Sequence, residues 1–449
     1  MVRNRFTLLP VIASLLLAVA PPVQAEDMPK STEKLLETFS WCGGIEDTFI
    51  PQIKPGLRRL EEYELTQHYE QWKADLDRAK SLGLTKLRWG IPWYRVEPKQ
   101  GQYDWSWTDQ VIPYMVDELK IDPIIDLVHY GTPTWMTQGF LDPEYPQKVA
   151  AYASAFAHRY KNKVKYYTPT NEPAVTAEFC GLKGEWPPYL TGESGYVRVL
   201  LPVARGIQEI AHAVREEDED ATLVAVEAMR HVAAADEKSE KAARQEFERD
   251  MLPWELVSGK VNHGHPLYEW LHANGADEVK LKELEEHATH QDVFGVNLYP
   301  WSLKIVHDTG NGKHTLTDAP ARGRVLAKVL QNVWDETKTP LFVTETSSKG
   351  DGTTRSLWMS ETIDAVRVAR SEGIPVVGYT WFPLITMIDW EYRTAKKPVT
   401  SYLLHLGLWD SNFNEDGLLV RHETPLVDNY RDWIRLGMPG RTELAIKGR

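Results

Sequence analysis

Eight short apolar segments, each followed by a charged segment of helical character, are the feature that most constrains this chain. Strands of a parallel sheet covered on both faces become near-continuous apolar runs, because neither face meets water. Strands alternating with helices predict an α/β fold, and eight of them predict a single (β/α)8 TIM barrel with extended loops after the strands. The predicted strands are residues 39–46, 84–93, 123–129, 164–170, 222–227, 293–299, 341–345 and 376–381.

A doubly wound open sheet is the structural alternative. It would normally carry a Gly-rich phosphate turn, and no G-x-G-x-x-G follows the first strand. The segment 66–83 predicts an amphipathic outer helix with Gly83 as its stop. The long, charged stretch 230–291 predicts additional helices inserted after the fifth strand of a domain that spans 26–449.

The N-terminal 25 residues predict a secretory signal peptide. Arg3 and Arg5 precede an apolar run over 8–20, and small residues lead to a cleavage site after Ala25. A membrane anchor is the alternative, but 13 residues fall short of the roughly 20 that a span requires. We therefore expect a secreted or periplasmic protein that has no membrane segment after cleavage.

The charge balance narrows the class of ligand. The chain has 64 Asp and Glu residues and 51 Lys and Arg residues, which gives a net charge of -13. Removal of Arg3 and Arg5 with the signal peptide makes it -15. Nucleic acid needs clustered positive charge and is not expected. The 17 Trp and 19 Tyr residues suit a site that stacks against a neutral sugar. The oligomeric state is left open.

The two cysteines and a histidine pair show no metal-site pattern. Cys42 and Cys180 lack a C-x-x-C spacing and are expected to be two unpaired buried thiols, although pairing stays open. His263 and His265 have no third ligand at a suitable spacing, so a solvated turn is favoured over a metal site. No metal and no cofactor is expected.

Carboxyl groups follow two predicted strands. Glu172 comes after the fourth strand, beside Asn171, and Glu345 ends the seventh. The carboxyl ends of barrel strands share one mouth, so both side chains are expected there. Two carboxyl groups across one mouth are the minimal equipment for cleaving a glycosidic bond.

Several motifs resemble those of the family 1 β-glucosidases, a group of retaining (β/α)8 glycoside hydrolases. Of T-x-N-E-P, Asn171, Glu172 and Pro173 match, with Thr168 three residues before Asn171, whereas T-E-N-G is matched only by Thr344 and Glu345. R-F-S-I-S-W resembles 88–93, L-x-H-W resembles 127–130, F-I-G-I-N-Y-Y resembles 294–299, and W-S-L-L-D-N-F-E-W resembles 381–390 with one residue inserted. The resemblance runs from about residue 39 to residue 390.

The resemblance implies roles for named residues. Glu172 would be the acid/base and Glu345 the nucleophile, with Arg88 and Tyr299 bonding to Glu345 to keep it ionised and aimed. The side chains implied to contact the sugar are Asn171, His129, Trp381, Asp389, Trp390, Glu46 and Asn297.

Two departures from the family pattern concern the substrate. Glu46 stands near the usual glutamine and would act as an acceptor only, and Asp389 replaces a glutamate with a side chain shorter by one methylene. The resemblance and the predicted signal peptide together imply a secreted retaining β-glycosidase that acts on a neutral β-linked sugar. The alternatives are a transglycosylase with the same covalent intermediate and a carbohydrate-binding barrel without catalysis.

Overall fold

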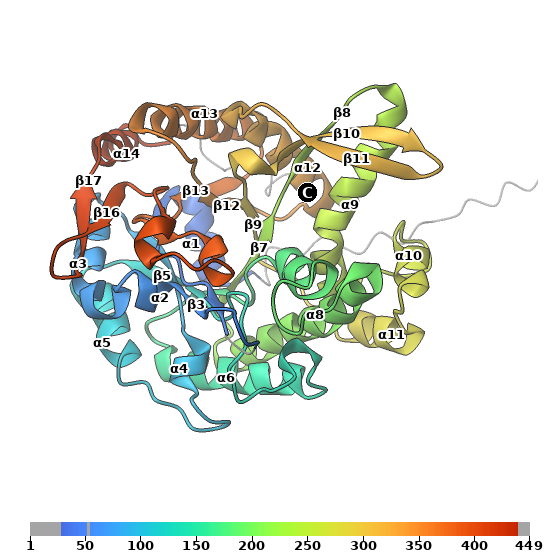
Figure 1. Cartoon of the computed structure of the whole chain (residues 1–449), viewed down its shortest axis with the longest axis horizontal. Coiled ribbons are helices and arrows are strands. Elements are labelled where there is room, and N and C mark those ends of the chain that lie inside the picture. The colour runs from blue at the N-terminus through green and yellow to red at the C-terminus, as the bar shows by residue number, and fades with distance from the viewer. Residues whose placement is uncertain (1–27, 52–53, 439–449) are drawn as a thin grey trace, which may run out of the picture.

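The structure, a computed structural model, describes residues 28–51 and 54–438. Its centre is a closed parallel barrel of eight strands that follow one another around the barrel in chain order (Figure 1). Because β1 pairs with both β4 and β13, the sheet closes on itself. The predicted (β/α)8 fold is confirmed, with strands β1 (Ser40–Gly44), β4 (Lys86–Gly90), β5 (Asp122–Asp126), β6 (Tyr166–Thr168), β7 (Thr222–Ala228), β9 (Val293–Asn297), β12 (Leu341–Thr346) and β13 (Val376–Trp381).

Apolar side chains fill the inside of the barrel. Ile124, Val224, Phe342 and Val377 belong to one buried cluster together with Cys42. Each comes from a different strand, so the interior is a packed core and not a channel. The second apolar layer lies outside, between the strands and the helices.

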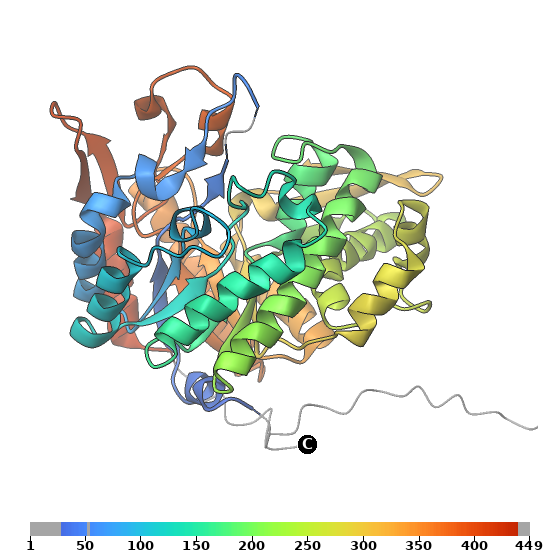
Figure 2. The same ribbon diagram turned by 90° about the horizontal axis from the view of Figure 1, so that it is seen from below.

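A short helix closes the N-terminal end of the barrel. Helix α1 (Lys30–Glu37) inserts Leu35 into the interior cluster, and the hydroxyls of Ser31 and Thr32 lie 2.6 and 2.9 Å from Thr222 Oγ1. Figure 2 shows α1, in dark blue, below the barrel and opposite the long loops. The sequence pattern did not predict this plug, which leaves the carboxyl ends of the strands as the accessible mouth.

Helices surround the barrel on the outside. The predicted helix at 66–83 is observed as α3 (His68–Ser81), with Leu76 and Ala79 fully buried and Gly83 in the left-handed region at φ 88°. Glycine adopts that conformation at low cost, so Gly83 ends the helix as predicted. The other outer helices are α5 (Thr108–Pro113), α6 (Tyr145–Tyr160), α8 (Gly192–Glu217), α12 (Leu326–Thr337), α13 (Gly352–Ser371) and α14 (Pro425–Leu436).

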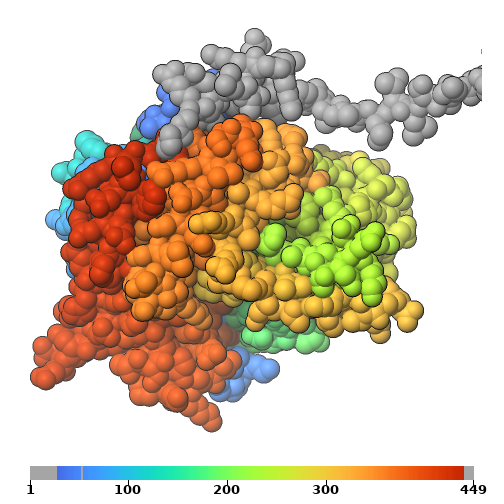
Figure 3. Space-filling view, turned by 90° about the horizontal axis from the view of Figure 1, so that it is seen from above, coloured from blue at the N-terminus to red at the C-terminus, as the bar shows by residue number. Residues whose placement is uncertain are grey.

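The segment 230–291 contains three helices and also a strand. The helices are α9 (Glu240–Val257), α10 (Tyr268–Ala273) and α11 (Glu278–Glu286). Strand β8 (His231–Ala234) was not predicted; it pairs with β10 (Leu303–Gly310), which forms a hairpin with β11 (Lys313–Asp318). In the space-filling view the light-green start of this segment lies against the orange hairpin (Figure 3). The partner strand lies about 70 residues away, so local periodicity gave no signal for it.

Short elements shape the remaining loops. They are β2 (Phe49–Ile50), β3 (Leu60–Glu61), α2 (Glu62–Leu65), α4 (Trp93–Val96), α7 (Pro173–Ala177), β14 (Met387–Ile388), β15 (Leu403–Leu404), β16 (Trp409–Phe413) and β17 (Leu419–Glu423). Among the described residues no helix combines the length and apolarity needed to cross a membrane. Cys42 and Cys180 are both buried and unpaired, as expected. The predicted signal peptide, 1–25, lies outside the described residues.

Candidate active site

Glu172 and Glu345 stand at the mouth of the barrel and line the same cavity. Glu345 lies within β12, and Glu172 follows β6 and precedes α7. The backbone of Glu172 is left-handed (φ 41°, ψ 65°), a conformation that costs a non-glycine residue about 1–2 kcal/mol. Its amide donates to the Val226 carbonyl at 3.0 Å, which ties this strained turn to β7.

Two donors hold the Glu345 carboxylate. Arg88, in the middle of β4, donates to Oε1 through Nη1, and the Tyr299 hydroxyl donates to Oε2 at 2.6 Å. Both side chains were predicted to bond to Glu345, and the structure brings them to it. The guanidinium and the phenol thus fix the direction of the Glu345 carboxylate through two hydrogen bonds, one of them charge-assisted.

Glu172 has different surroundings. The Tyr130 hydroxyl donates to Oε2, and the Asn297 amide donates to Oε1 at 2.7 Å. Burial first, and then the charge of Glu345, raise the pKa of Glu172 to about 7, against the opposing effect of these two hydrogen bonds. A carboxyl group with this pKa can both give and take a proton near neutral pH.

Two side-chain bridges connect the surroundings of the two carboxyl groups. Asn297 donates to Glu172 and accepts at 2.7 Å from Thr344, the residue before Glu345. Arg88 bonds Glu345 and also donates through Nη2 to Asn171 Oδ1 at 2.6 Å, next to Glu172 in the chain. The relative position of the pair is therefore fixed by side chains of four strands and their ends.

His129 lies in a cluster of charges that the sequence analysis did not identify. Its Nδ1 is 2.8 Å from Asp47 Oδ1 and 3.3 Å from Asp126 Oδ2. Because Arg88 orients the Asn171 oxygen, the Asn171 nitrogen faces His129 Nε2 at 2.9 Å and donates to it. Nδ1 therefore faces the two aspartates at ion-pair distances.

The same three residues have the composition of a metal site. The ligand atoms of Asp47, Asp126 and His129 lie within 4.8 Å of one another. However, Arg88 Nη2 is 2.7 Å from Asp126 Oδ2, and a second cation beside a guanidinium is electrostatically disfavoured. We therefore interpret the group as a hydrogen-bonded ion cluster. Gly90 makes room for it, since a Cβ there would lie 1.6 Å from Asp47 Oδ2.

Glu46 lines the cavity next to this cluster. Its Oε1 accepts from the Thr48 amide at 3.0 Å and from the Thr48 hydroxyl at 2.5 Å. Burial raises the pKa of Glu46, and burial together with Glu46 raises the pKa of the neighbouring Glu62. In both hydrogen bonds Glu46 is the acceptor.

The other predicted sugar-contacting residues fall into two groups. Asp389 and Trp390 line the cavity. Asn171, Asn297 and Trp381 are at most 1% exposed and lie behind the lining residues, where the Trp381 indole donates to the Leu406 carbonyl at 3.0 Å. In this structure they support the wall, and Leu406 itself faces the cavity.

The cavity is large and extends well beyond the two carboxyl groups. Its volume is about 980 Å³. It reaches from Glu46 and His129 past the pair to α9, α10 and the tip of the β10–β11 hairpin. In the loop after the N-E-P element, the Glu178 side chain lines the cavity and the Trp186 side chain is buried behind it.

The comparison with protein families decides the class. The profile of glycosyl hydrolase family 1 matches residues 44–344, two thirds of the chain. The chain belongs to glycosyl hydrolase family 1. It is therefore a glycoside hydrolase from a family of retaining glycosidases, and the predicted family is confirmed. The match includes the N-E-P element and ends one residue before Glu345.

Individual relatives are distant. The chain is 22% identical to Beta-glucosidase 47 of Arabidopsis thaliana. The match covers 77% of this chain and 72% of that protein. The chain is also 22% identical over 77% of its length to Beta-glucosidase A of Thermotoga maritima, with 85% of that protein covered. The family 1 β-glucosidase structure from Thermotoga maritima superposes with a TM-score of 0.79 at 17% identity, covering 90% of this chain and 99% of that one. At this identity the superposition establishes the fold alone.

The histidine pair of the 230–291 segment is not part of a metal cluster among the described residues. His265 bonds Glu255 at 2.9 Å, and the His263 side chain is 77% exposed. The solvated-turn interpretation therefore fits His263, whereas His265 is held by its hydrogen bond to Glu255.

Four residues near the pair were not identified as site residues from the sequence. Asp126 is the last residue of β5 and Glu227 the last but one of β7, Asp47 follows Glu46, and Tyr130 follows His129. Glu227 is fully buried, accepts from the Ala228 amide at 2.9 Å, and has its pKa raised well above the ordinary value by burial and by Glu172. The rule that selected Glu345, a carboxyl group at the end of an apolar strand, would also have selected Asp126 and Glu227.

Proposed function

We propose that this chain is a secreted retaining β-glycosidase that hydrolyses O-glycosidic bonds of a neutral β-linked sugar through a covalent glycosyl-enzyme intermediate. The observation that carries the proposal is the contrast between two carboxyl groups in one cavity. Glu345 is bonded to Arg88 and Tyr299, whereas the pKa of Glu172 is raised to about 7. A retaining glycosidase requires one ionised nucleophile and one proton donor.

Glu345 is the proposed nucleophile. Its carboxylate would attack the anomeric carbon as the bond to the leaving oxygen breaks, which gives a glycosyl ester. The Arg88 and Tyr299 donors fix the direction of this carboxylate. The hydrogen bond from Tyr299 leaves Glu345 as the ester forms, and the tyrosine can remain as a donor toward the ring region.

Glu172 is the proposed acid/base. In the first step its proton passes to the leaving oxygen, and in the second its carboxylate takes a proton from the water that displaces Glu345. The raised pKa of Glu172 supports both roles. Part of the increase comes from the negative charge of Glu345, and this charge is neutralised when the ester forms. Glu172 then becomes more acidic in the step in which it must act as a base.

The sugar end of the cavity is proposed to bind a neutral glycone. Glu46, His129, Asp389 and Trp390 line this end, and Asn171 lies directly behind His129. Sugar hydroxyl groups both donate and accept, so the Glu46 and Asp389 carboxyl groups can accept from them. The identity of the sugar and its linkage are not specified by these contacts.

The proposal that the protein is secreted rests only on the sequence of residues 1–25. A signal peptide cleaved after Ala25 would deliver the enzyme to the periplasm or the medium. N-terminal sequencing of the enzyme recovered outside the cytoplasm is expected to begin at Glu26. Retention of the full N-terminus inside the cell would contradict secretion without affecting the catalytic proposal.

A panel of activated aryl β-glycosides tests the activity. The proposal expects release of the aryl alcohol from at least one neutral β-glycoside, with the first sugar product also in the β configuration. A carbohydrate-binding barrel would release none. A transglycosylase, which the aromatic cluster of Tyr130, Trp186 and Trp390 would favour by excluding water, would release more when an acceptor sugar is added.

A further inference from the structure

Asp126 is a buried carboxylate that the proposed mechanism does not use. It is the last residue of β5, two residues after Ile124, whose side chain belongs to the cluster inside the barrel. Side chains two residues apart in a strand share one face, so Asp126 also points into the barrel. On the neighbouring strand, Arg88 lies in register with Ile124 and shares that face. The two strands thus bring a carboxylate and a guanidinium together beside the reacting groups.

Asp126 contacts Arg88 at two points. Arg88 Nε donates to Asp126 Oδ1 at 3.1 Å, and Nη2 lies 2.7 Å from Oδ2. A single contact would let the guanidinium turn about its side-chain torsions, whereas two parallel contacts fix its plane. Burial raises the pKa of Asp126, but the charge of Arg88 and the hydrogen bond and charge of His129 lower it below its ordinary value. Asp126 is therefore a carboxylate at neutral pH.

The other contacts of Arg88 are with groups of the proposed reaction. Its Nη1 donates to Glu345 Oε1, and its Nη2 donates at 2.6 Å to Asn171 Oδ1, next to Glu172 in the chain. The guanidinium is planar and rigid, so the edge that Asp126 holds determines where the remaining donors point. A displacement of Asp126 would therefore be passed on to the nucleophile.

The second neighbour, His129, depends less on Asp126. Its Nδ1 is 3.3 Å from Asp126 Oδ2 but 2.8 Å from Asp47 Oδ1, and its Nε2 accepts from Asn171 at 2.9 Å. Loss of the Asp126 carboxylate would leave His129 with the two closer partners. Arg88, by contrast, would keep only Glu345 as an ion-pair partner among the described residues.

The same combination of side chains occurs a second time, away from the cavity. Asp75 accepts from Arg421 Nε and Nη2, both at 3.0 Å, and is bonded to His68 at 3.0 Å. There the other contacts of Arg421 are with backbone, the carbonyls of Leu419 and Thr66 at 2.6 and 2.7 Å. Two carboxylate–arginine pairs of similar geometry thus differ in what the arginine holds, which is backbone in one and reacting side chains in the other.

We propose that Asp126 is a positioning residue for the reaction that acts through Arg88. Its two-point contact fixes the plane of the guanidinium and thereby the direction in which Arg88 holds Glu345 and Asn171. This inference rests on the proposed function and adds a residue to its machinery. It also explains why a carboxylate is buried beside a nucleophile of the same charge, a placement that costs stability and has no use in binding the sugar.

The test separates how fast Glu345 attacks from how many enzyme molecules can attack. A 2-deoxy-2-fluoro β-glycoside with an activated leaving group, built on the sugar selected by the aryl panel, gives both the rate constant of covalent labelling and the labelled fraction. We expect Asp126→Asn to reduce the rate constant on the order of 10²-fold, the loss that a misplacement of about 1 Å can cause. The labelled fraction should stay close to that of the wild type, whereas a merely structural role would lower the fraction and not the rate constant.

A double-mutant cycle identifies the route. In an Arg88→Met background, Asp126→Asn should change the rate constant by less than about twofold, because no guanidinium is left to position. The matched control is Asp75→Asn, which breaks the comparable pair beside α3. We expect this control to unfold at a lower urea concentration and to be labelled with an unchanged rate constant.

Three results would overturn the inference. The first is an Asp126→Asn enzyme with the wild-type rate constant and a smaller labelled fraction. The second is an equal loss with and without Arg88, which would assign the effect to another neighbour such as His129. If Asp126→Asn does not fold, Asp126→Ser, which removes the charge and leaves space for a water molecule, replaces it, and failure of both variants to fold would assign Asp126 to the scaffold alone. Absence of labelling in the wild type would instead overturn the proposed function, so the two failures are distinguishable.

Discussion

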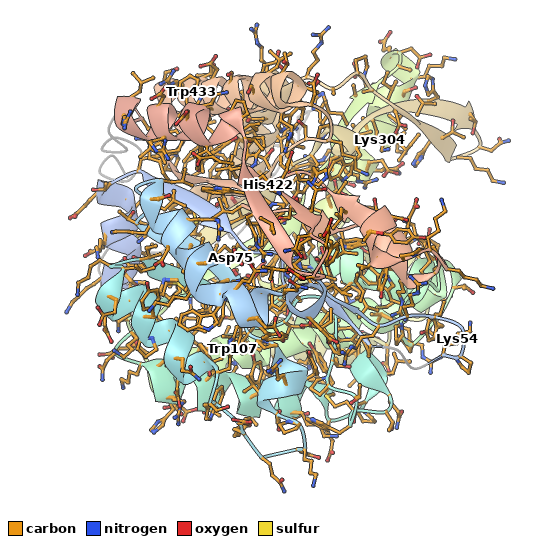
Figure 4. The ribbon with its side chains drawn as sticks, turned by 60° about the vertical axis from the view of Figure 1, so that its left-hand side comes forward. Lys54, Asp75, Trp107, Lys304, His422 and Trp433 are labelled. Carbon is orange, nitrogen blue, oxygen red and sulfur yellow. The ribbon has the colours of Figure 1, made fainter. Side chains whose placement is uncertain are left out.

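The barrel mouth and the outer face of α3 both bury carboxylates around an arginine, but the charges are balanced in only one of them. Beside α3, Asp75 accepts from Arg421 at 3.0 Å, from His68 at 3.0 Å and from Arg78 at 3.3 Å. Figure 4 shows Asp75 on α3, facing the strand that carries His422. Burial raises the pKa of Asp75, yet the hydrogen bond and charge of His68 and the charge of Arg421 lower it below its ordinary value.

At the mouth, carboxyl groups outnumber the positive charges that could pair with them. Arg88 is shared by Asp126 and Glu345, while Glu46 and Glu172 have raised pKa values. The cluster around Asp75 has enough cations, and it holds α3 and β17 together. The cluster at the barrel mouth has too few cations, so one acid stays protonated beside one carboxylate. This arrangement lowers stability but supplies acid–base chemistry.

Removing the nucleophile should produce the largest effect. Glu345→Ala is expected to reduce kcat on the order of 10⁵-fold, because no other group can form the glycosyl ester. Added azide, a small anionic nucleophile, should partly restore aryl alcohol release by occupying the vacated space. Steady-state kinetics with and without azide provides the measurement. Activity close to that of the wild type would remove Glu345 from this role.

Removing the acid should give an effect that depends on the leaving group. Glu172→Gln keeps the shape but cannot give a proton, so we expect a loss of about 10²–10⁴-fold in kcat/KM for alkyl and sugar leaving groups. Activated aryl groups leave without protonation, so kcat/KM for their glycosides should fall far less in that step. An equal loss across leaving groups of different pKa would contradict the assignment.

A substitution in the charge-balanced cluster around Asp75 should lower the stability of the protein and leave its activity unchanged. Arg421→Met leaves Asp75 buried with less compensation, and breaking a buried pair costs about 3–5 kcal/mol. We expect the free energy of unfolding in urea to fall by that amount while kcat is unchanged. Arg435→Met is the matched control, since Arg435 pairs with Asp432 at the surface with 71% exposure of its side chain. A stable Arg421→Met variant with altered kcat would contradict the distinction between the two clusters.

The smallest predicted effect is a shift in pH dependence. The Tyr130 hydrogen bond lowers the pKa of Glu172, so Tyr130→Phe should raise it. Since the protonated acid is required, kcat/KM should fall as the pH rises above about 7 in the wild type, and this limb should move up by about one pH unit in the variant. Tyr160→Phe on α6, outside the cavity, should leave the limb in place. A downward shift in Tyr130→Phe would contradict the hydrogen-bond argument.

The sequence predicted the parts of the molecule that depend on local pattern. All eight barrel strands and α3 followed from apolar runs and helical spacing, and the N-E-P element placed Glu172. Strand β8, the plug formed by α1 and the Asp47–His129 contact depend on residues distant in the chain, so periodicity carries no information about them. The balance of charge that separates Glu172 from Glu345 likewise exists only after folding.

The central claim, that Glu345 forms a covalent bond to the sugar, is tested most directly by trapping that bond. A 2-deoxy-2-fluoro β-glycoside of the preferred sugar with an activated leaving group should inactivate the enzyme, because the fluorine slows hydrolysis of the ester more than its formation. We expect a mass increase of one fluoroglycosyl group on the peptide that contains Glu345. A label on a different residue, or turnover with inversion at the anomeric carbon and no label at all, would contradict it.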